Sequence, residues 1–216
     1  VSGHRCLVDP AGLFPGKAAA QRLLLHPGGA ALRREIREEL SAQMRRILES
    51  GIAIDHADGH QHIHVFPAVF EIAADLAAGQ GIPWLRVPVE APPVSRRDSL
   101  RPGAMEEAAL FSRQAAAAGP HFRALGIRTA DHFRGLYLKG RLPADDWDGF
   151  LRELPGGLTE LMVHPGCVEG KAPGPFAGFS TAERERELTA LTDGRFRTAL
   201  LQSGVALVPY PGIKEF

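Results

Sequence analysis

The sequence predicts an α/β protein with a parallel sheet, either open or closed into a barrel. Strand-like and helix-like segments alternate along the whole chain, without an internal repeat or a second compositional zone. Several candidate site residues also follow strand-like segments, and functional groups in parallel α/β folds gather at the carboxyl ends of strands. We therefore expect one domain over residues 1–216.

The first half of the chain has two helical patterns and two apolar stretches. Apolar residues recur every three or four positions from Leu32 to Leu48, which predicts an amphipathic helix, and Gly51 is its expected stop. Pro67 suits the first position of a second helix. The predicted segments are, in order, a helix over 32–48, a buried strand over 52–54, a helix from 67 that ends within 79–83, and a strand over 84–87.

The second half continues the alternation. Ser180 and Glu183 have the spacing of a capping box, which predicts the start of a helix. Asp193 and Gly194 should break that helix. The predicted segments are a loop over 92–102, a helix over 105–118, a strand within 127–133, a helix over 145–154, a strand over 160–163, a loop over 165–179, a broken helix from 180 to 201, and a strand over 205–208.

The composition bounds the class of protein. Twenty-five basic residues balance twenty-five acidic ones, so no net field favours nucleic acid or an anionic membrane. Cys6 and Cys167 are too few for a disulfide framework, and the default compartment is the reducing cytoplasm. The apolar runs are shorter than a membrane span. We expect no nucleic-acid partner and no membrane span, and the sequence leaves the oligomeric state open, with a homodimer as one option.

Four of the nine histidines fall between His56 and His64, directly after the apolar stretch 52–54. Imidazole is the commonest neutral metal ligand. In an extended segment His60, His62 and His64 would point to one face, whereas in a helix only the first and last would. Asp58 is close enough in sequence to orient a ligand histidine. The alternative is a polar loop whose histidines only form hydrogen bonds.

Three further residues are candidates for the site. His164 follows the predicted strand 160–163 and precedes Pro-Gly, which suits acid–base chemistry or, alternatively, a structural cap of the strand. His132 lies at the end of another predicted strand, where the structural interpretation is favoured. Arg86 interrupts an apolar strand and either pairs with a buried carboxylate or faces the mouth of the site.

The segment 58–67, DGHQHIHVFP, resembles the histidine signature of the YdjC/ChbG-like carbohydrate deacetylases, a family that also includes hopanoid-associated members. Other stretches are similar to this family in the same order. They are 7–12 (LVDPAG), 85–88 (LRVP), 131–135 (DHFRG), 159–166 (TELMVHPG) and 208–210 (VPY). The resemblance therefore extends over most of the chain.

The resemblance implies an irregular TIM-like (β/α) barrel and a metal-dependent hydrolase that removes acetyl groups from N-acetylated sugars such as chito-oligosaccharides. It implies that His60 is a ligand of a divalent metal ion, Mg or Zn, and that His164 is the catalytic residue that protonates the departing amine. Asp58, His62, His64, Arg86 and His132 would bind substrate or support these two histidines. The implied partner is a small sugar.

One part of the family pattern is not found. Family members open with a strand ending in Asn-Ala-Asp-Asp and a later strand ending in Gly-x-His, which supply a base and two metal ligands. Neither motif occurs ahead of the histidine signature in this sequence. We therefore expect a barrel that is incomplete because the first two βα units are missing, and a chain that is inactive alone if the segment is required.

Two other functions remain as hypotheses. One is a noncatalytic metal- or carbohydrate-binding remnant that lacks a complete site. The other is a different metallohydrolase in which His60 and His64 bind the metal together. Metal content, deacetylation of an N-acetylated sugar and the ligands of a bound metal would distinguish them.

Overall fold

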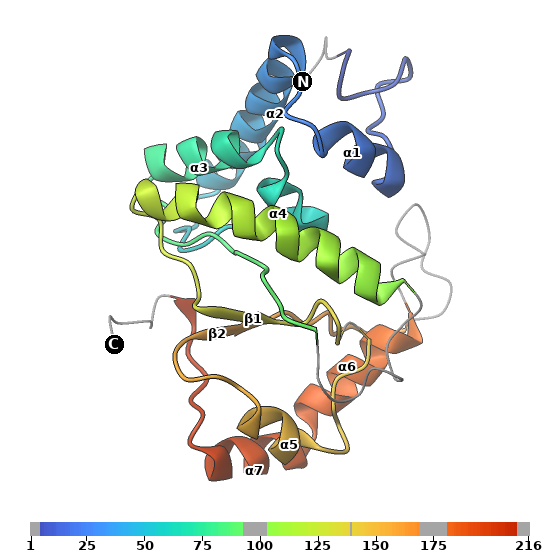
Figure 1. The fold of residues 1–216 in the computed structure, drawn as a ribbon, viewed down its shortest axis with the longest axis vertical. Coiled ribbons are helices and arrows are strands. Elements are labelled where there is room, and N and C mark those ends of the chain that lie inside the picture. The colour runs from blue at the N-terminus through green and yellow to red at the C-terminus, as the bar shows by residue number, and fades with distance from the viewer. Residues whose placement is uncertain (1–4, 93–102, 139, 169–180, 211–216) are drawn as a thin grey trace. The chain divides into compact units, whose positions relative to one another are not determined.

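The computed structural model describes residues 5–92, 103–138, 140–168 and 181–210 (Figure 1). The chain divides into two compact units. The first unit comprises 1–89, 110–130 and 210–216, and the second comprises 90–109 and 131–209. The fold is helix-rich and mixed α/β with parallel strand pairing, which confirms the predicted class. The barrel and the single domain stay predictions.

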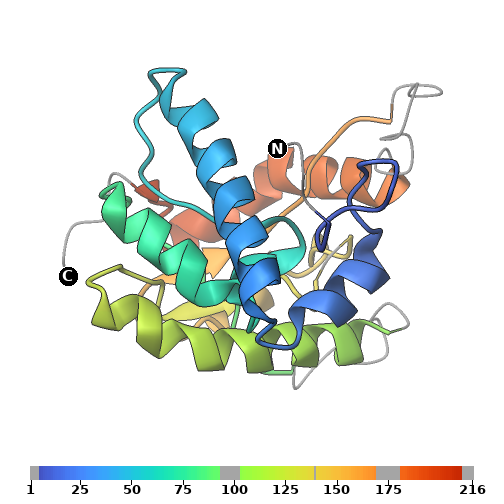
Figure 2. The same ribbon diagram turned by 90° about the horizontal axis from the view of Figure 1, so that it is seen from above.

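The first unit is built mainly from helices. They are α1 (Lys17–Leu24), α2 (Ala30–Leu48), the 3₁₀ helix η1 (His60–Val65) and α3 (Phe70–Gly79). Helix α2 confirms the predicted amphipathic helix, and its apolar face buries Leu32 and Ile36. Helix α3 begins three residues after Pro67, because 66–69 form a turn that follows η1. Figure 2 shows α2 and α3 in blue and green from above.

Helices α2 and α3 are joined by two ion pairs on matching helical turns. Arg33 lies 2.6 Å from Glu71, and Arg37 lies 2.9 Å from Asp75. Residues four apart lie on the same face of a helix, so the two pairs form one seam. All four side chains are partly exposed, and such pairs stabilise a fold only modestly. The seam therefore fixes the register of the two helices more than it adds stability.

A buried carboxylate on α2 holds the segment that precedes α1. The side chain of Glu35 is only 4% exposed. Its two oxygens accept hydrogen bonds from the main-chain N–H groups of Arg5, Cys6 and Leu7, at 2.9, 2.7 and 3.0 Å. A buried carboxylate is costly unless its oxygens are paired, and here three amide donors supply the pairing. Residues 5–7 are thus fastened to α2 without regular secondary structure.

Helix α4 (Ala104–Ala124) is longer than the predicted helix over 105–118. A buried stripe runs along it at alternating spacings of four and three: Ala104, Ala108, Phe111, Ala115, Ala118 and Phe122. The helix continues through Pro120, which cannot donate a main-chain hydrogen bond. Pro120 and Ala116 are both exposed, so water can reach the carbonyl group that loses its partner. The buried stripe outweighs the local preference of proline.

The described part of the second unit contains the start of α4, two short strands and three further helices. Strands β1 (His132–Arg134) and β2 (Thr159–Leu161) pair in parallel, with Phe133 opposite Glu160, and Figure 1 shows them side by side. Helices α5 (Trp147–Arg152), α6 (Ala182–Thr192) and α7 (Gly194–Ser203) follow. Trp147 anchors their core, with ring centroids 4.4 Å from Phe196 and 6.0 Å from Phe150.

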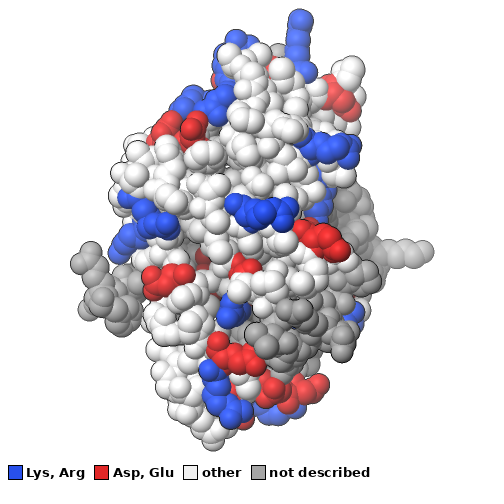
Figure 3. All heavy atoms as spheres, viewed as in Figure 1, with Lys and Arg blue, Asp and Glu red and all other residues white. Residues whose placement is uncertain are grey.

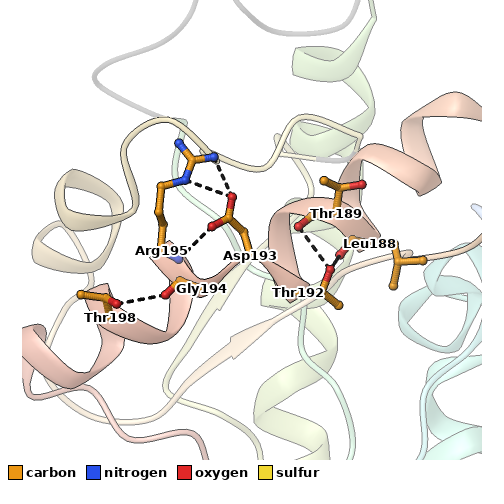
Figure 4. Close-up of polar contacts among 7 residues, drawn as sticks. All are labelled: Leu188, Thr189, Thr192, Asp193, Gly194, Arg195 and Thr198. Carbon is orange, nitrogen blue, oxygen red and sulfur yellow. Dashed lines mark hydrogen bonds and ion pairs between the residues drawn. The ribbon is translucent and has the colours of Figure 1, made fainter.

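The break between α6 and α7 is made by Asp193, as predicted (Figure 4). One oxygen of its carboxylate accepts a hydrogen bond from the main-chain N–H of Arg195 at 2.8 Å, and the other pairs with the guanidinium of the same residue at 2.7 Å. These bonds lower the pKa of Asp193. In the last turn of α6 the hydroxyl of Thr192 donates to the carbonyl of Leu188 at 2.9 Å. Asp193 is both the residue that follows the end of α6 and the one that caps the start of α7.

Two predicted strands are wrong. Residues 52–54 and 205–208 form no strand in the described structure, and Ile52 and Leu207 are 66% and 70% exposed. A strand persists only where a neighbour satisfies its main-chain groups, and no described residue forms a ladder with either segment. The described strand pairing that follows residues 52–54 is the single parallel bridge between Ala57 and Leu85.

Other predicted segments are confirmed in part. The strand over 127–133 is present as a bridge at Arg128 and as β1, and the strand over 84–87 is present as bridges at Trp84 and Leu85. Helix 145–154 corresponds to α5, capped by Asp146. Most of the loops over 92–102 and 165–179, together with the capping residue Ser180, lie outside the described residues.

The surface is mixed in charge. Figure 3 shows basic and acidic side chains interspersed over the face in view, in line with the equal numbers of each in the sequence. Within the described ranges, none of the helices has the length and apolar character needed to cross a bilayer.

Replacing Glu35 by alanine should lower the free energy of unfolding by about 2 kcal/mol, because three main-chain N–H groups lose their buried acceptor. Urea unfolding at neutral pH measures the change. The matched control is Glu38→Ala on the same helix, which removes an exposed pair with Arg34 and should cost less than about 0.5 kcal/mol. Equal losses in the two variants would contradict the anchoring role of Glu35.

Candidate functional site

The histidine loop, residues 58–64, is fastened to the segment 84–86 of the first unit. The main-chain N–H of Ala57 donates to the carbonyl of Trp84 at 3.0 Å, and the N–H of Arg86 donates to the carbonyl of Ala57 at 3.2 Å. This pair of bonds is the parallel bridge that precedes the loop. Trp84 is itself buried, and the guanidinium of Arg128 lies 4.6 Å from its ring centre. The loop therefore starts from a fixed point.

The backbone of the loop is left-handed at two consecutive residues. Gln61 and His62 have φ angles of 54° and 56°, and neither is glycine. Such residues each cost of order 1–3 kcal/mol and persist only where their surroundings hold them. The geometry differs from both the extended and the helical alternatives. As a result His60 is exposed, whereas His62 and His64 are buried.

His64 bridges the two ends of this arrangement. Its Nδ1 accepts a hydrogen bond from the main-chain N–H of Gly59 at 2.9 Å. Its Nε2 lies 2.8 Å from the carbonyl oxygen of Arg86, so Nε2 carries the proton and donates it. A Cβ atom at Gly59 would lie 2.9 Å from the main-chain nitrogen of His64, which explains why glycine is required there. Both ring nitrogens are thus used by main-chain groups.

The electrostatics of His64 keep its imidazole neutral. Burial of the ring lowers its pKa from 6.5 to about 4, because the charged form would lose its hydration. The hydrogen bond to the Arg86 carbonyl and the carboxylate of Asp58 oppose this shift, and the Arg86 guanidinium adds to it. The ring of His62 lies 6.4 Å away. At neutral pH His64 therefore joins the two segments through hydrogen bonds and does not act as a general acid.

Asp58 and Arg86 form an ion pair beside this bridge. Arg86 is 18% exposed and Asp58 is 38% exposed. Of the two alternatives left by the sequence, pairing with a carboxylate is therefore observed, although the carboxylate is only half-buried. Asp58, His64 and Arg86 are thus brought together, and they join the loop to the 84–86 segment.

The remaining histidines of the loop have different surroundings. The ring of His62 packs edge-on against Phe111, with centroids 4.9 Å apart. His60 opens η1 and is the exposed imidazole of the three. Within the described residues, no group of three histidine, cysteine, aspartate or glutamate side chains is arranged to hold a metal ion. The metal role of His60 stays a prediction.

His164 lies in the second unit, three residues beyond the end of β2. Its main-chain N–H donates to the carboxylate of Glu187, and its carbonyl accepts from the Nε of Arg184 at 3.2 Å. The side chain is half-buried. The predicted position beyond a strand end is confirmed, whereas a common sheet edge for His60 and His164 stays a prediction.

The predicted position of His132 at the end of a strand is wrong. It is the first residue of β1 and pairs with Thr159, the first residue of β2. Parallel strands share their direction, so His132 lies at the edge of this sheet opposite to the end that leads to His164. Its Nε2 donates to the carbonyl of Gly156 at 3.1 Å. The sequence suggested a strand that ends near 133, whereas pairing begins at 132.

A buried carboxylate that sequence reasoning missed supports the end of β1. Glu90 is 5% exposed and accepts hydrogen bonds from the N–H groups of Gly135 and Leu136 at 3.1 and 2.7 Å. Burial raises the pKa of Glu90, and its amide donors oppose that shift. The signal was present, because Glu90 follows the apolar run Val87-Pro88-Val89. Glu187, by contrast, lies in a helix rich in charges and has no such signal.

An open depression of about 660 Å³ lies in the second unit between residues 140–145 and helices α6 and α7. None of the predicted site residues lines it. Its charged lining includes Arg141, Asp145 and Arg186, so it has no dominant sign. We assign it no part in the chemistry discussed below.

The parallel α/β fold and the histidine loop have counterparts among known proteins. The family model described as YdjC-like protein matches residues 2–202. A carbohydrate deacetylase of Mus musculus is 36% identical over 215 residues, which cover 93% of this chain and 68% of that protein. A carbohydrate deacetylase of Homo sapiens is 36% identical over 219 residues, which cover 95% of this chain and 67% of that protein.

The fold also resembles a crystal structure from Enterococcus faecalis V583, of a protein proposed to cleave cellobiose phosphate. The TM-score is 0.64, the identity is 19%, and the similarity covers 94% of this chain and 67% of that one. From the family match and the two relatives, the chain belongs to the YdjC-like protein family.

The stability of the fold should fall as the pH drops from about 6.5 towards 4. The pKa of His64 is lower in the folded than in the unfolded chain, so the unfolded chain takes up the proton first. The free energy of unfolding should decrease by up to about 3 kcal/mol from this group alone, the equivalent of a pKa shift from 6.5 to about 4. Urea unfolding at pH 7, 5.5 and 4.5 measures it.

Comparison of the wild type with His64→Gln isolates the contribution of His64 to the pH dependence of stability. The carboxylates titrate in both proteins, so their contribution cancels. Its stability should depend less steeply on pH than that of the wild type. The control His26→Gln removes an exposed histidine and should leave the slope unchanged. If the wild type and His64→Gln have equal slopes between pH 7 and 4.5, the buried neutral imidazole is not present in solution.

Proposed function

We propose that this protein is a carbohydrate deacetylase that hydrolyses the acetamide bond of an N-acetylated sugar, with chito-oligosaccharides as the first substrates to test. Membership of the YdjC-like family and similarity to two carbohydrate deacetylases support this activity. The structural observation that carries the proposal is the exposure of His60. Its neighbours His62 and His64 are buried, so His60 is the histidine of the loop that a ligand or substrate can reach from solvent.

The proposed chemistry is the attack of water on the acetamide carbonyl, followed by loss of the sugar amine. The C–N bond breaks as the amine nitrogen takes up a proton, since an amide anion is a very poor leaving group. We assign this proton to the imidazolium of His164, which lies beyond a strand end on a main chain held at both its N–H and its carbonyl. The products are acetate and the free amino sugar.

The proposal includes a divalent metal ion, Mg or Zn, with His60 as one ligand. The described residues alone do not fit a complete site, because they offer no set of three suitable side chains. The other histidines of the loop are engaged, His64 by two main-chain groups and His62 by packing on Phe111. Further ligands would have to come from outside the described residues.

We also propose an irregular (β/α) barrel as the complete architecture. The support is the parallel pairing of β1 with β2, the two parallel bridges of the first unit and the structural similarity described above. A crystal structure in which these strands form one closed sheet with further strands would agree with the proposal. Strands that belong to separate open sheets would contradict it.

Substitution of His60 by alanine should weaken the binding of Zn²⁺ to this chain by at least tenfold, because the exposed imidazole is lost. Isothermal titration calorimetry of the two proteins with Zn²⁺, and separately with Mg²⁺, measures the affinity. His26→Ala is a control for nonspecific binding by an exposed histidine. Equal affinities of the wild type and His60→Ala would remove His60 from the metal site.

Substitution of His164 by glutamine should reduce acetate release from N-acetylglucosamine oligomers by about 10²–10⁴-fold, the usual contribution of a general acid. The control His132→Gln changes a histidine at the other edge of the same sheet and should retain most of the activity. Full activity of His164→Gln would exclude it as the acid. A wild-type chain that binds these sugars but releases no acetate would favour the noncatalytic alternative.

A further inference from the structure

Helix α6 carries three side chains on one face that contact two loops of the second unit. Glu183 and Glu187 are four residues apart, and Arg184 lies between them, so the three project from neighbouring turns. One loop follows β1 and contains Gly140, and the other follows β2 and contains His164. Neither loop has regular secondary structure at these residues.

Glu187 connects the two loops through one carboxylate. It is 2% exposed, although the helix around it is rich in exposed charge. Its Oε1 accepts the main-chain N–H of Gly140 at 2.5 Å, and its Oε2 accepts the main-chain N–H of His164. Hydrogen bonds from amides to an ionised carboxylate are stronger than those between neutral groups. Each oxygen therefore fixes one loop.

Arg184 binds the main-chain carbonyl of His164, whereas Glu187 binds its main-chain N–H. Its Nε donates to the carbonyl of His164 at 3.2 Å, and its own main-chain carbonyl accepts the N–H of Gly166 at 3.2 Å. The main-chain donor and acceptor of His164 are thus both bound by residues one helical turn apart. The N–H and the carbonyl of a residue belong to its two flanking peptide units, so a residue bound at both groups has little freedom in φ and ψ, which set the direction of its Cα–Cβ bond.

The loop after β1 is fitted to the same face. Gly140 has a φ of 75°, and a Cβ atom there would lie 2.9 Å from the Cβ of Glu183. The loop can approach α6 closely enough to reach Glu187 only because residue 140 is glycine. Because of this close fit, the position of the Glu187 carboxylate depends on the loop that contains Gly140 as well as on the loop that contains His164.

We propose that Glu187, together with Arg184, is a positioning residue that fixes the main chain of His164 and thereby the direction of its imidazole. The proposal rests on the proposed function only for the catalytic consequence of that direction. Glu187 itself does not touch the reacting atoms. The same carboxylate couples the loop after β1 to His164, so a change at Gly140 should be felt at the imidazole.

The first test needs no catalytic activity. Hydrogen exchange followed by NMR should find the amides of Gly140 and His164 protected in the wild type. In Glu187→Gln one oxygen becomes an NH₂ group that cannot accept, so at least one of the two amides should exchange about 10- to 100-fold faster, the loss expected for a hydrogen bond to a charged acceptor. The Cε1–H signal of His164 should move, and its pH titration curve should change.

Two further variants keep the test decisive. Glu185→Gln, on an exposed side of the same helix, should leave both exchange rates and the His164 signal unchanged. Arg184→Met removes the bond to the His164 carbonyl and should shift the same Cε1–H signal even if Glu187→Gln does not fold. Exchange of both wild-type amides at the rate of an unstructured peptide, or unchanged signals in both test variants, would overturn the proposal.

The second test asks whether the hydrogen bonds of Glu187 and Arg184 to the main chain of His164 affect deacetylation. In Glu187→Gln kcat should fall by about tenfold or more with KM changed less than twofold, because misplacing a proton donor affects the transition state more than substrate binding. An unchanged kcat with altered NMR signals would overturn the catalytic consequence. If the wild type and His164→Gln are equally inactive, the proposed function fails. The NMR measurements still decide whether Glu187 and Arg184 fix the main chain of His164.

Discussion

The irregular segments of this fold depend on buried carboxylates that accept main-chain N–H groups. Glu35, Glu90 and Glu187 are each at most 5% exposed, and each binds two or three amides that lie outside regular secondary structure, Glu187 from two separate loops. A sheet normally satisfies such amides through its ladder, but the strands described here are only three residues long. The carboxylates satisfy the amides and are themselves stabilised by them.

His64 applies the same principle with a neutral side chain. It binds one main-chain donor and one main-chain acceptor, which only the neutral imidazole can do. In this way it holds a loop whose left-handed residues would otherwise relax. Of the three histidines of the loop, two are buried and pack inside the unit, and the third, His60, is exposed. A cluster of histidines in a sequence therefore need not be a cluster of ligands.

Most helices were predictable because their signals are local, although α1 was not predicted. The period of apolar residues in α2, the proline and glycine signals around α3, and the break at Asp193 are all present within a few residues. The strands over 52–54 and 205–208 were not predictable, because a short apolar run becomes a strand only if another segment pairs with it. The residues of the site also divide into those with a local signal in the sequence and those without one. The loop and His164 stood out as motifs, whereas Glu187 became significant only through two loops distant in sequence.

The position of Glu187 in the chain has a consequence for folding during synthesis. The carboxylate lies 47 residues after Gly140 and 23 residues after His164. A ribosome releases the chain from its N-terminus, so both loops emerge before the helix that fixes them. The core around Trp147 also awaits Phe196, which arrives later still. His164 therefore reaches its final orientation only after α6 has been made, and a nascent chain arrested before α6 carries this histidine on an unanchored loop.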